Sequence, residues 1–131
     1  AAQQLKAGRL DRDAQVAAGK ALFLGTCSAC HQQEGQGVPS VFPPLAKSDF
    51  LAGDKKRAIG VVLNGLTGPV TVNGATFNSV MPPLSHLADD EIANILTYVY
   101  ASWGNRGDVV SPADVLAARE ATRAQRPPGA V

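Results

Sequence analysis

The strongest chemical signal in the sequence is a group of three reactive residues within five positions. Cys27, Cys30 and His31 form a C-x-x-C-H run that holds both cysteines of the chain and one of its two histidines. This run is the attachment signature of c-type haem, because two thiols three positions apart can reach the two vinyl groups on one porphyrin edge. The adjacent imidazole can then bind the iron as its proximal ligand. The run predicts one covalent haem c.

Three other interpretations of the two cysteines stay open. A thioredoxin-type redox pair also has the C-x-x-C spacing, but it follows a strand in a βαβ unit, and no βαβ pattern occurs here. A zinc site would need Cys27, Cys30, His31 and His86 to converge, and the neighbours at 30 and 31 are poorly placed to bind one ion together. The third alternative is an incidental buried pair. Covalent haem is the favoured interpretation.

The second axial ligand decides what such a haem can do. Met81 is the only methionine of the chain, and it lies in a charge-free loop that Pro82 and Pro83 stiffen. A lone methionine is usually a core residue, but this one does not lie on a helical stripe. His86 is the alternative and would give bis-histidine ligation, and an open position is another. We favour Met81 as the distal ligand.

The elements that must position these residues are mostly helices. Apolar residues at helical spacing predict a helix over 13–24, capped by Asp11 or Asp13, that leads directly into Cys27. Capping residues and periodicity predict four more helices, at about 49–52, 54–65, 87–103 and 111–125. The only strand signal is a hairpin of 70–72 and 75–77 around Asn73 and Gly74. Residues 126–129 are typical of a disordered tail.

Composition and charge exclude several classes of protein. The chain has 131 residues, of which 45% are hydrophobic and 18% charged, and this indicates one globular domain with a short appendage. A formal net charge of +1 argues against nucleic acid as a partner. No run is apolar enough to span a membrane, and the absence of an initiator methionine predicts a mature secreted chain or a piece of a longer one. Residues 58–88 carry no charge other than a histidine, so we expect them to wrap an apolar group or form a contact face.

Over positions 13–103 the sequence resembles the class I c-type cytochromes. Gly19 and Phe23 precede the cysteines at the spacing this family uses where its N-terminal helix crosses the C-terminal one, and Ile95 and Tyr98 match the residues that meet them. The resemblance implies an all-α class I cytochrome c fold, with helices around one covalent haem, a small β-hairpin before the distal methionine loop and an extra C-terminal helix. It implies an N-terminal extension or linker over 1–12, a cytochrome c domain over 13–104 and a C-terminal extension over 105–131.

The resemblance also assigns residues around the haem. It implies that the Pro43 carbonyl accepts a hydrogen bond from the His31 imidazole and that Leu45 packs on the haem. Segments 42–49, 72–74, 81–83 and 102–105 are similar to the C-terminal haem domain of some bacterial copper nitrite reductases. They are almost as similar to the cytochrome subunits of periplasmic dehydrogenases. Ala88 departs from the usual Ser or Thr cap, so Asp89 is expected to take over as the cap and the helix to begin one residue later.

The implied function is electron transfer, because an iron with both axial positions filled has no place for a substrate. The chain is expected to be no enzyme by itself and to pass single electrons to or from a periplasmic oxidoreductase, as a domain feeding a copper nitrite reductase. The alternatives are a free or dehydrogenase-subunit cytochrome c, a ligand-binding or peroxidatic haem protein if Met81 dissociates easily, and an interaction module whose haem is structural.

The expected partner is a redox protein or domain that docks at an apolar haem edge. Segments 21–33, 35–46 and 66–84 would border that edge, and none of them contains Asp, Glu, Lys or Arg. Few charge pairs would then form across the contact, as suits a transient encounter or a tethered partner. The basic run at 55–57 is expected to be a solvated helix start rather than a docking patch.

Overall fold

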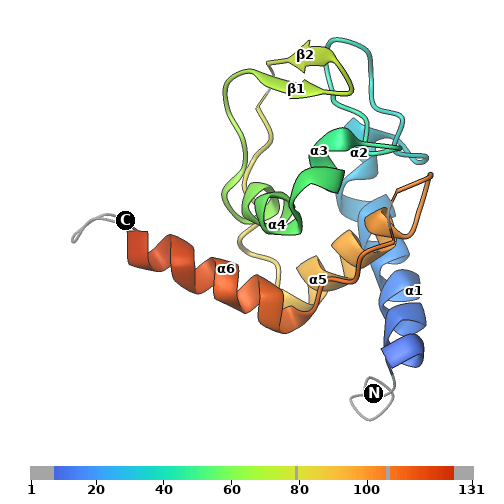
Figure 1. Cartoon of the computed structure of the whole chain (residues 1–131), viewed down its shortest axis with the longest axis vertical. Coiled ribbons are helices and arrows are strands. Elements are labelled where there is room, and N and C mark those ends of the chain that lie inside the picture. The colour runs from blue at the N-terminus through green and yellow to red at the C-terminus, as the bar shows by residue number, and fades with distance from the viewer. Residues whose placement is uncertain (1–7, 79, 106, 126–131) are drawn as a thin grey trace.

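The computed structural model describes residues 8–78, 80–105 and 107–125. Within these ranges the chain forms six helices and one two-stranded antiparallel sheet: α1 (Gly8–Thr26), α2 (Ser28–His31), α3 (Asp49–Gly53), α4 (Lys55–Asn64), β1 (Val70–Val72), β2 (Ala75–Phe77), α5 (Asp89–Tyr100) and α6 (Pro112–Gln125). Figure 1 shows the hairpin at one end of the molecule and α6 extending from the other. The predicted helical class with one small hairpin is therefore observed.

The crossing of α1 and α5 forms the centre of the molecule, as the spacing of Gly19 predicts. A Cβ atom placed on Gly19 would lie 1.9 Å from the carbonyl oxygen of Asn94 and 2.9 Å from the Cβ of Tyr98. Only a residue without a side chain lets the two backbones approach so closely. Beside the crossing, the rings of Phe23, Tyr98 and Trp103 pack with centroids 5.3 to 5.6 Å apart.

The predicted start of the first helix is wrong. The helix begins at Gly8 rather than at position 13, so neither Asp11 nor Asp13 caps it. Residues 9–12 contain no glycine or proline that would stop a helix, and the charged residues among them have adequate helix propensity. Five residues assigned to the N-terminal extension thus continue the first helix of the domain.

Local capping signals placed the starts of α3 and α4 correctly. The Ser48 hydroxyl accepts a hydrogen bond from the Leu51 amide, and the Asp54 carboxylate accepts one from the Lys56 amide. At α5 the predicted start is wrong: the helix begins at Asp89 rather than at 87, and Ala88 rather than Asp89 holds the N-cap position, where its amide donates a hydrogen bond to the Glu91 carboxylate at 2.8 Å. The same helix ends at Tyr100 rather than 103.

The hairpin and α6 also form as predicted. β1 and β2 pair in the register that sets Val72 opposite Ala75, and Asn73 and Gly74 both have positive φ, as a type I′ turn requires. At α6, the amides and side chains of Ser111 and Asp114 exchange two hydrogen bonds of 3.0 and 3.1 Å. Residues 126–131, predicted as a tail, lie outside the described residues.

The segment that joins α5 to α6 is tied into the core. The buried Gln15 amide donates hydrogen bonds to the Thr97 hydroxyl at 3.2 Å and to the Val110 carbonyl at 2.7 Å. Thr97 and Val110 exchange two further bonds, so the buried polar groups of this corner satisfy one another. α6 then packs against α4 and α5. Among the described residues, no helix has the length and apolar character needed to cross a membrane.

Candidate functional site

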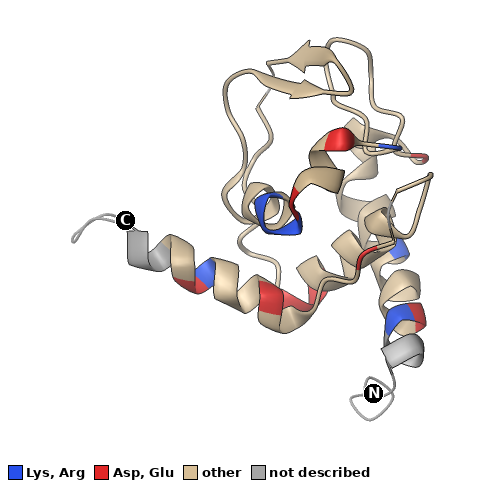
Figure 2. Ribbon diagram, viewed as in Figure 1, with Lys and Arg blue, Asp and Glu red and all other residues tan. Residues whose placement is uncertain are grey.

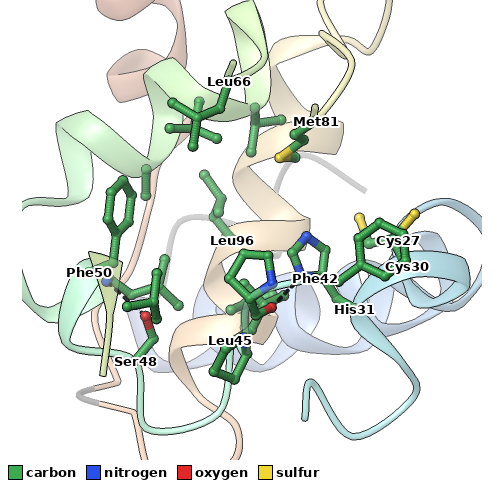
Figure 3. Close-up of a pocket in the computed structure, with 18 of the residues that line it drawn as sticks. Cys27, Cys30, His31, Phe42, Leu45, Ser48, Phe50, Leu66, Met81 and Leu96 are labelled. Carbon is green, nitrogen blue, oxygen red and sulfur yellow. Dashed lines mark hydrogen bonds between the residues drawn. The ribbon is translucent and has the colours of Figure 1, made fainter. Parts of the chain in front are cut away.

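One large cavity lies between α1, α4, α5 and the long loops. Its walls are mostly aliphatic and aromatic, and no Asp, Glu, Lys or Arg lines it. Figure 3 shows the sulfur atoms of Cys27 and Cys30 at one end, Phe50 and Ser48 at the other, and Met81 above His31. The residues that line it come from every region between α1 and α5: Phe23, Thr26, Cys27, Cys30, His31, Phe42, Pro43, Pro44, Leu45, Ser48, Phe50, Leu51, Ala58, Val61, Val62, Leu66, Val70, Val72, Val80, Met81, Pro82, Leu84, Ile95, Leu96 and Val99.

A tight helical turn brings the C-x-x-C-H residues to the cavity wall. The amides of Cys30 and His31 both donate to the Cys27 carbonyl, at 3.2 and 3.0 Å. This turn follows α1 directly, so the motif is held at the end of a long helix. The two cysteines are free thiols, with Cys27 half-buried and Cys30 exposed. Both thiols therefore border the same cavity without forming a disulfide.

The surroundings of these residues do not suit the alternatives considered from the sequence. Burial, reinforced by the nearby Cys30, raises the pKa of Cys27 to about 11, so the thiolate that redox exchange requires is disfavoured. Among the described residues, no three His, Cys, Asp or Glu side chains gather as a metal site would need. His86 in particular is exposed and does not line the cavity. The four proposed zinc ligands therefore do not converge.

The orientation of the His31 ring is set by one hydrogen bond. Its Nδ1 donates to the Pro43 carbonyl at 2.9 Å, and this leaves the lone pair of Nε2 available to a ligand in the cavity. Burial lowers the pKa of His31, while the bond to Pro43 opposes that shift, so the ring is neutral near pH 7. A neutral imidazole with one free lone pair is the form that binds a metal.

The loop that carries Pro43 is itself tightly closed. Gly37 has a φ of 69°, and a Cβ atom there would lie 2.4 Å from the Phe42 carbonyl oxygen. The Leu45 amide donates to the Gly35 carbonyl, and the Asn105 side chain donates to the Leu45 carbonyl at 2.8 Å. The segment therefore holds Pro43 and Leu45 against the cavity, where the resemblance placed them.

Met81 reaches the cavity from the opposite chain segment. Its amide and carbonyl exchange two hydrogen bonds of 2.9 Å with Leu66, and the Leu84 amide donates to the Val62 carbonyl at the end of α4. Met81 is half-buried among these residues and packs against the core. The structure thus brings Met81 into the cavity together with Cys27, Cys30 and His31, whereas His86 lies outside it.

Several cavity residues were not singled out from the sequence. Leu96 and Val99 lie on the apolar stripe of α5, so its periodicity marked them as buried but could not show that they face the cavity. Phe50 and Ser48 line the end away from the cysteines, and neither carried a chemical signal. Asn105, which binds the Leu45 carbonyl, was part of the segment 102–105 that resembles a haem domain, but no role was assigned to its side chain.

The basic run after Asp54 begins α4, as the sequence predicts, and Lys56 and Arg57 are exposed, while Lys55 and Arg57 also contact neighbouring groups. The Lys55 ammonium donates to the Val109 carbonyl at 3.0 Å and lies 3.3 Å from the Asp114 carboxylate. The Arg57 guanidinium packs 3.8 Å from the centre of the Phe50 ring and donates to the Phe50 carbonyl. Long basic side chains often cover neighbouring apolar surface in this way.

The residues around the cavity fit a flat apolar group that carries a metal. Two thiols at one end can bind it covalently, while a neutral imidazole and a thioether can approach its metal from different chain segments. The remaining wall is apolar and would exclude water from its faces. Haem c has these properties, and iron bound by soft sulfur and imidazole ligands is well known in proteins.

Comparison with known proteins agrees with this fit. The family described as cytochrome c matches residues 16–103, which is more than half of the chain. Cytochrome c-552 of Thermus thermophilus is 42% identical over 89 residues, which cover 65% of this chain and 68% of that protein. The cytochrome c subunit of the quinone alcohol dehydrogenase of Gluconobacter oxydans is 32% identical over 110 residues, or 81% of this chain.

A third relative is the cytochrome c subunit of gluconate 2-dehydrogenase from Pantoea cypripedii, which is 31% identical over 106 residues and 78% of this chain. The matched regions cover only 24% of that subunit and 23% of the alcohol dehydrogenase subunit. The predicted class I fold and the predicted cofactor are both confirmed by the family match. The chain belongs to the cytochrome c family, whose members bind haem c covalently and transfer electrons.

Proposed function

We propose that the chain carries single electrons through one haem attached at Cys27 and Cys30, with His31 and Met81 as its axial ligands. The observation that carries this proposal is the meeting of these four side chains at one uncharged cavity. When bound, the haem supplies a reversible one-electron couple. With both axial positions filled by protein ligands, the iron has no position for a substrate, so the chain acts as a carrier rather than a catalyst.

The residues of the chain tune that couple in three ways. Pro43 fixes the plane of the His31 ring and raises its basicity through the Nδ1 hydrogen bond. The thioether of Met81 favours the reduced iron more than a second imidazole would, and so raises the potential. The uncharged wall keeps water from the iron. Because the additional positive charge of the oxidised iron is then poorly solvated, the oxidised state is disfavoured.

The relatives support a dehydrogenase or a free cytochrome pool as the redox partner. They include a cytochrome c-552 and the cytochrome subunits of alcohol and gluconate dehydrogenases. We therefore propose that the chain accepts electrons from a periplasmic dehydrogenase, either as part of its cytochrome subunit or as a separate carrier. Electron supply to a copper nitrite reductase is the second candidate, and it rests on the similarity of segments 42–49, 72–74, 81–83 and 102–105 alone.

We also propose that the partner docks on the uncharged surface beside the cavity. Figure 2 shows that Lys, Arg, Asp and Glu lie mainly on the helices, while the hairpin and the loops on either side of it are uncoloured. Two valines are well exposed on this side of the chain: Val80, which follows the hairpin, at 66%, and Val41, in the uncharged part of the loop between α2 and α3, at 42%. An apolar contact of this kind is expected of brief redox encounters.

Replacing the two candidate distal ligands tests the assignment of the iron ligands. Met81→Ala should abolish the far-red band that a thioether bound to ferric iron produces, and should lower the reduction potential. His86→Ala is the matched control and should leave the band and the potential unchanged, because His86 is exposed outside the cavity. The reverse pattern would show bis-histidine ligation and overturn the assignment.

Acidic acetone extraction tests the covalent attachment independently. Haem held by two thioethers should stay with the polypeptide, whereas haem held only by axial ligands should be released when the ligands are protonated. The Cys27→Ser and Cys30→Ser double variant should release its haem or fail to retain it. Release from the unmodified protein would contradict the proposal.

A further inference from the structure

The extra helix α6 contacts the loop that carries Met81 through a single arginine. Arg119 donates three hydrogen bonds: from Nε to the Asp89 carboxylate at 2.8 Å, from Nη1 to the Ser85 carbonyl at 2.8 Å and from Nη2 to the Leu87 carbonyl at 2.7 Å. Its side chain is 23% exposed. A planar guanidinium holds several acceptors in fixed directions, so this one fixes the segment between Met81 and α5.

The segment that Arg119 binds is held by few other backbone hydrogen bonds, although its Leu84 and Leu87 side chains pack against the core. Residues 82–88 form no helix or strand. The Leu84 amide is bonded to Val62, and the Leu87 amide to Leu84. The carbonyls of Ser85 and Leu87 accept from Arg119, which lies more than 30 residues further along the chain. Charge-assisted bonds to carbonyls are stronger than neutral ones, so Arg119 supplies a large share of the restraint.

A second contact of α6 reaches the other support of Met81. The Asn64 side chain, at the end of α4, donates to the Thr122 hydroxyl at 3.2 Å. Gly65 follows, and a Cβ atom on it would lie 2.5 Å from the Met81 carbonyl oxygen. Leu66 then forms the two-bond bridge to Met81. Arg119 and Thr122 lie one turn apart on the same face of α6. This face therefore touches the chain on both sides of the Met81 loop.

We propose that α6 braces the distal loop and that Arg119 is a positioning residue for Met81. The proposal rests on the proposed function only in taking Met81 as the ligand of the iron. Departure of the Met81 thioether requires the loop to move away from the cavity, and Arg119 holds the C-terminal end of that loop to α6. Without the guanidinium, the segment at 85–87 loses two backbone contacts and the loop opens more often.

Competition by imidazole measures how often the loop opens. Imidazole added to the ferric protein binds the iron only when Met81 has left, so its apparent affinity reports the fraction of open molecules. Arg119→Met keeps most of the aliphatic stem but loses all three hydrogen bonds. It should raise the apparent affinity for imidazole about tenfold or more, given the usual strength of charge-assisted bonds. Arg119→Lys retains the charge with fewer bonds and should give an intermediate value.

A control variant separates positioning from general support by α6. Lys55→Gln removes the ion pair between Lys55 and Asp114, which lies near the start of α6 in the turn before Arg119 and does not touch the segment at 85–87. Its apparent affinity for imidazole should stay within about twofold of the unmodified protein, because an exposed ion pair contributes little. Melting temperatures of both variants are recorded, so that their losses of global stability can be compared.

The outcomes distinguish failure of the brace from failure of the ligand assignment. If Arg119→Met and Lys55→Gln bind imidazole with equal affinity, Arg119 does not position Met81 and the inference is wrong. If the unmodified protein lacks the far-red band, the assignment of Met81 fails first. If Arg119→Met yields no haem protein, Thr122→Val decides, because it removes the bond from Asn64 together with the bond that the Thr122 hydroxyl donates to the Ala118 carbonyl within α6. An affinity raised about threefold supports the brace, and an unchanged one overturns it.

Discussion

Leu66 and Met81 exchange two backbone hydrogen bonds of 2.9 Å and form an isolated antiparallel bridge beside the cavity. The bridge is possible because the preceding residue, Gly65, has a φ of 75° and no side chain. The chain leaves α4 there in the left-handed region, which a residue with a Cβ atom rarely adopts. The direction of Met81 is thus determined by a glycine sixteen positions earlier in the sequence.

We expect Gly65→Ala to disturb Met81. The added methyl group would meet the Met81 carbonyl and would strain the backbone, so stability should fall by about 2 kcal/mol or more, and the far-red band should weaken. Gly60→Ala is the control, because no atom lies within 4 Å of a Cβ atom there and alanine favours the helix by up to about 1 kcal/mol. Denaturant unfolding and the visible spectrum check both. An unchanged band in Gly65→Ala would contradict the role of the bridge.

Gly19→Ala should destabilise the protein by separating α1 from α5. Overpacking of a close contact usually costs about 1 to 3 kcal/mol, and here the methyl group would face the rigid carbonyl of Asn94. Gly25→Ala lies in the same helix with open space around it, so it should be neutral or stabilising by up to about 1 kcal/mol. Melting temperatures of the two variants should therefore shift in opposite directions or differ strongly. Equal shifts would rule out the crossing as the cause.

The contribution of Asp114 should depend on pH. The hydrogen bond from the Ser111 amide, helped by Lys55, holds the pKa of Asp114 below its ordinary value of 3.8. Because the folded pKa is the lower one, this contribution is fully present above the unfolded pKa and is lost as pH falls through the folded pKa. Asp114→Asn should therefore cost about half a kcal/mol near neutral pH, after screening by solvent, and nothing in strong acid. Denaturant titrations at both pH values check this, and a difference that persists in acid would point to lost packing instead.

Electron exchange with small reagents should depend weakly on ionic strength. Segments 21–33, 35–46 and 66–84 carry no Asp, Glu, Lys or Arg, so they offer little charge to steer a charged reagent. The rate at which an anionic metal complex oxidises the reduced protein should change less than about threefold between low and physiological salt, and so should the rate for a cationic complex. Stopped-flow measurements of both reagents test this. If the rate falls steeply with added salt for one reagent and rises for the other, the docking face is charged.

Much of the local structure was predictable because its signals lie within a few residues of one another. Ser48, Asp54 and Ser111 each cap a helix through bonds to amides two or three positions away. Asn73 and Gly74 both take the positive φ of a tight turn. Such short-range preferences act whatever the rest of the chain does. The C-x-x-C-H run is equally local, so the sequence by itself determined the cofactor.

Only the tertiary structure decided which long-range partners meet. Met81 lines the cavity and His86, five positions later, does not, because the bridge to Leu66 directs the first while the second lies in an exposed turn. Likewise nothing near Arg119 in the sequence marks it as a partner of Ser85. The contacts of Arg119 depend on the packing of α6 beside α4 and α5. Such packing buries surface between residues that are distant along the chain, and no local sequence pattern shows which of them will meet.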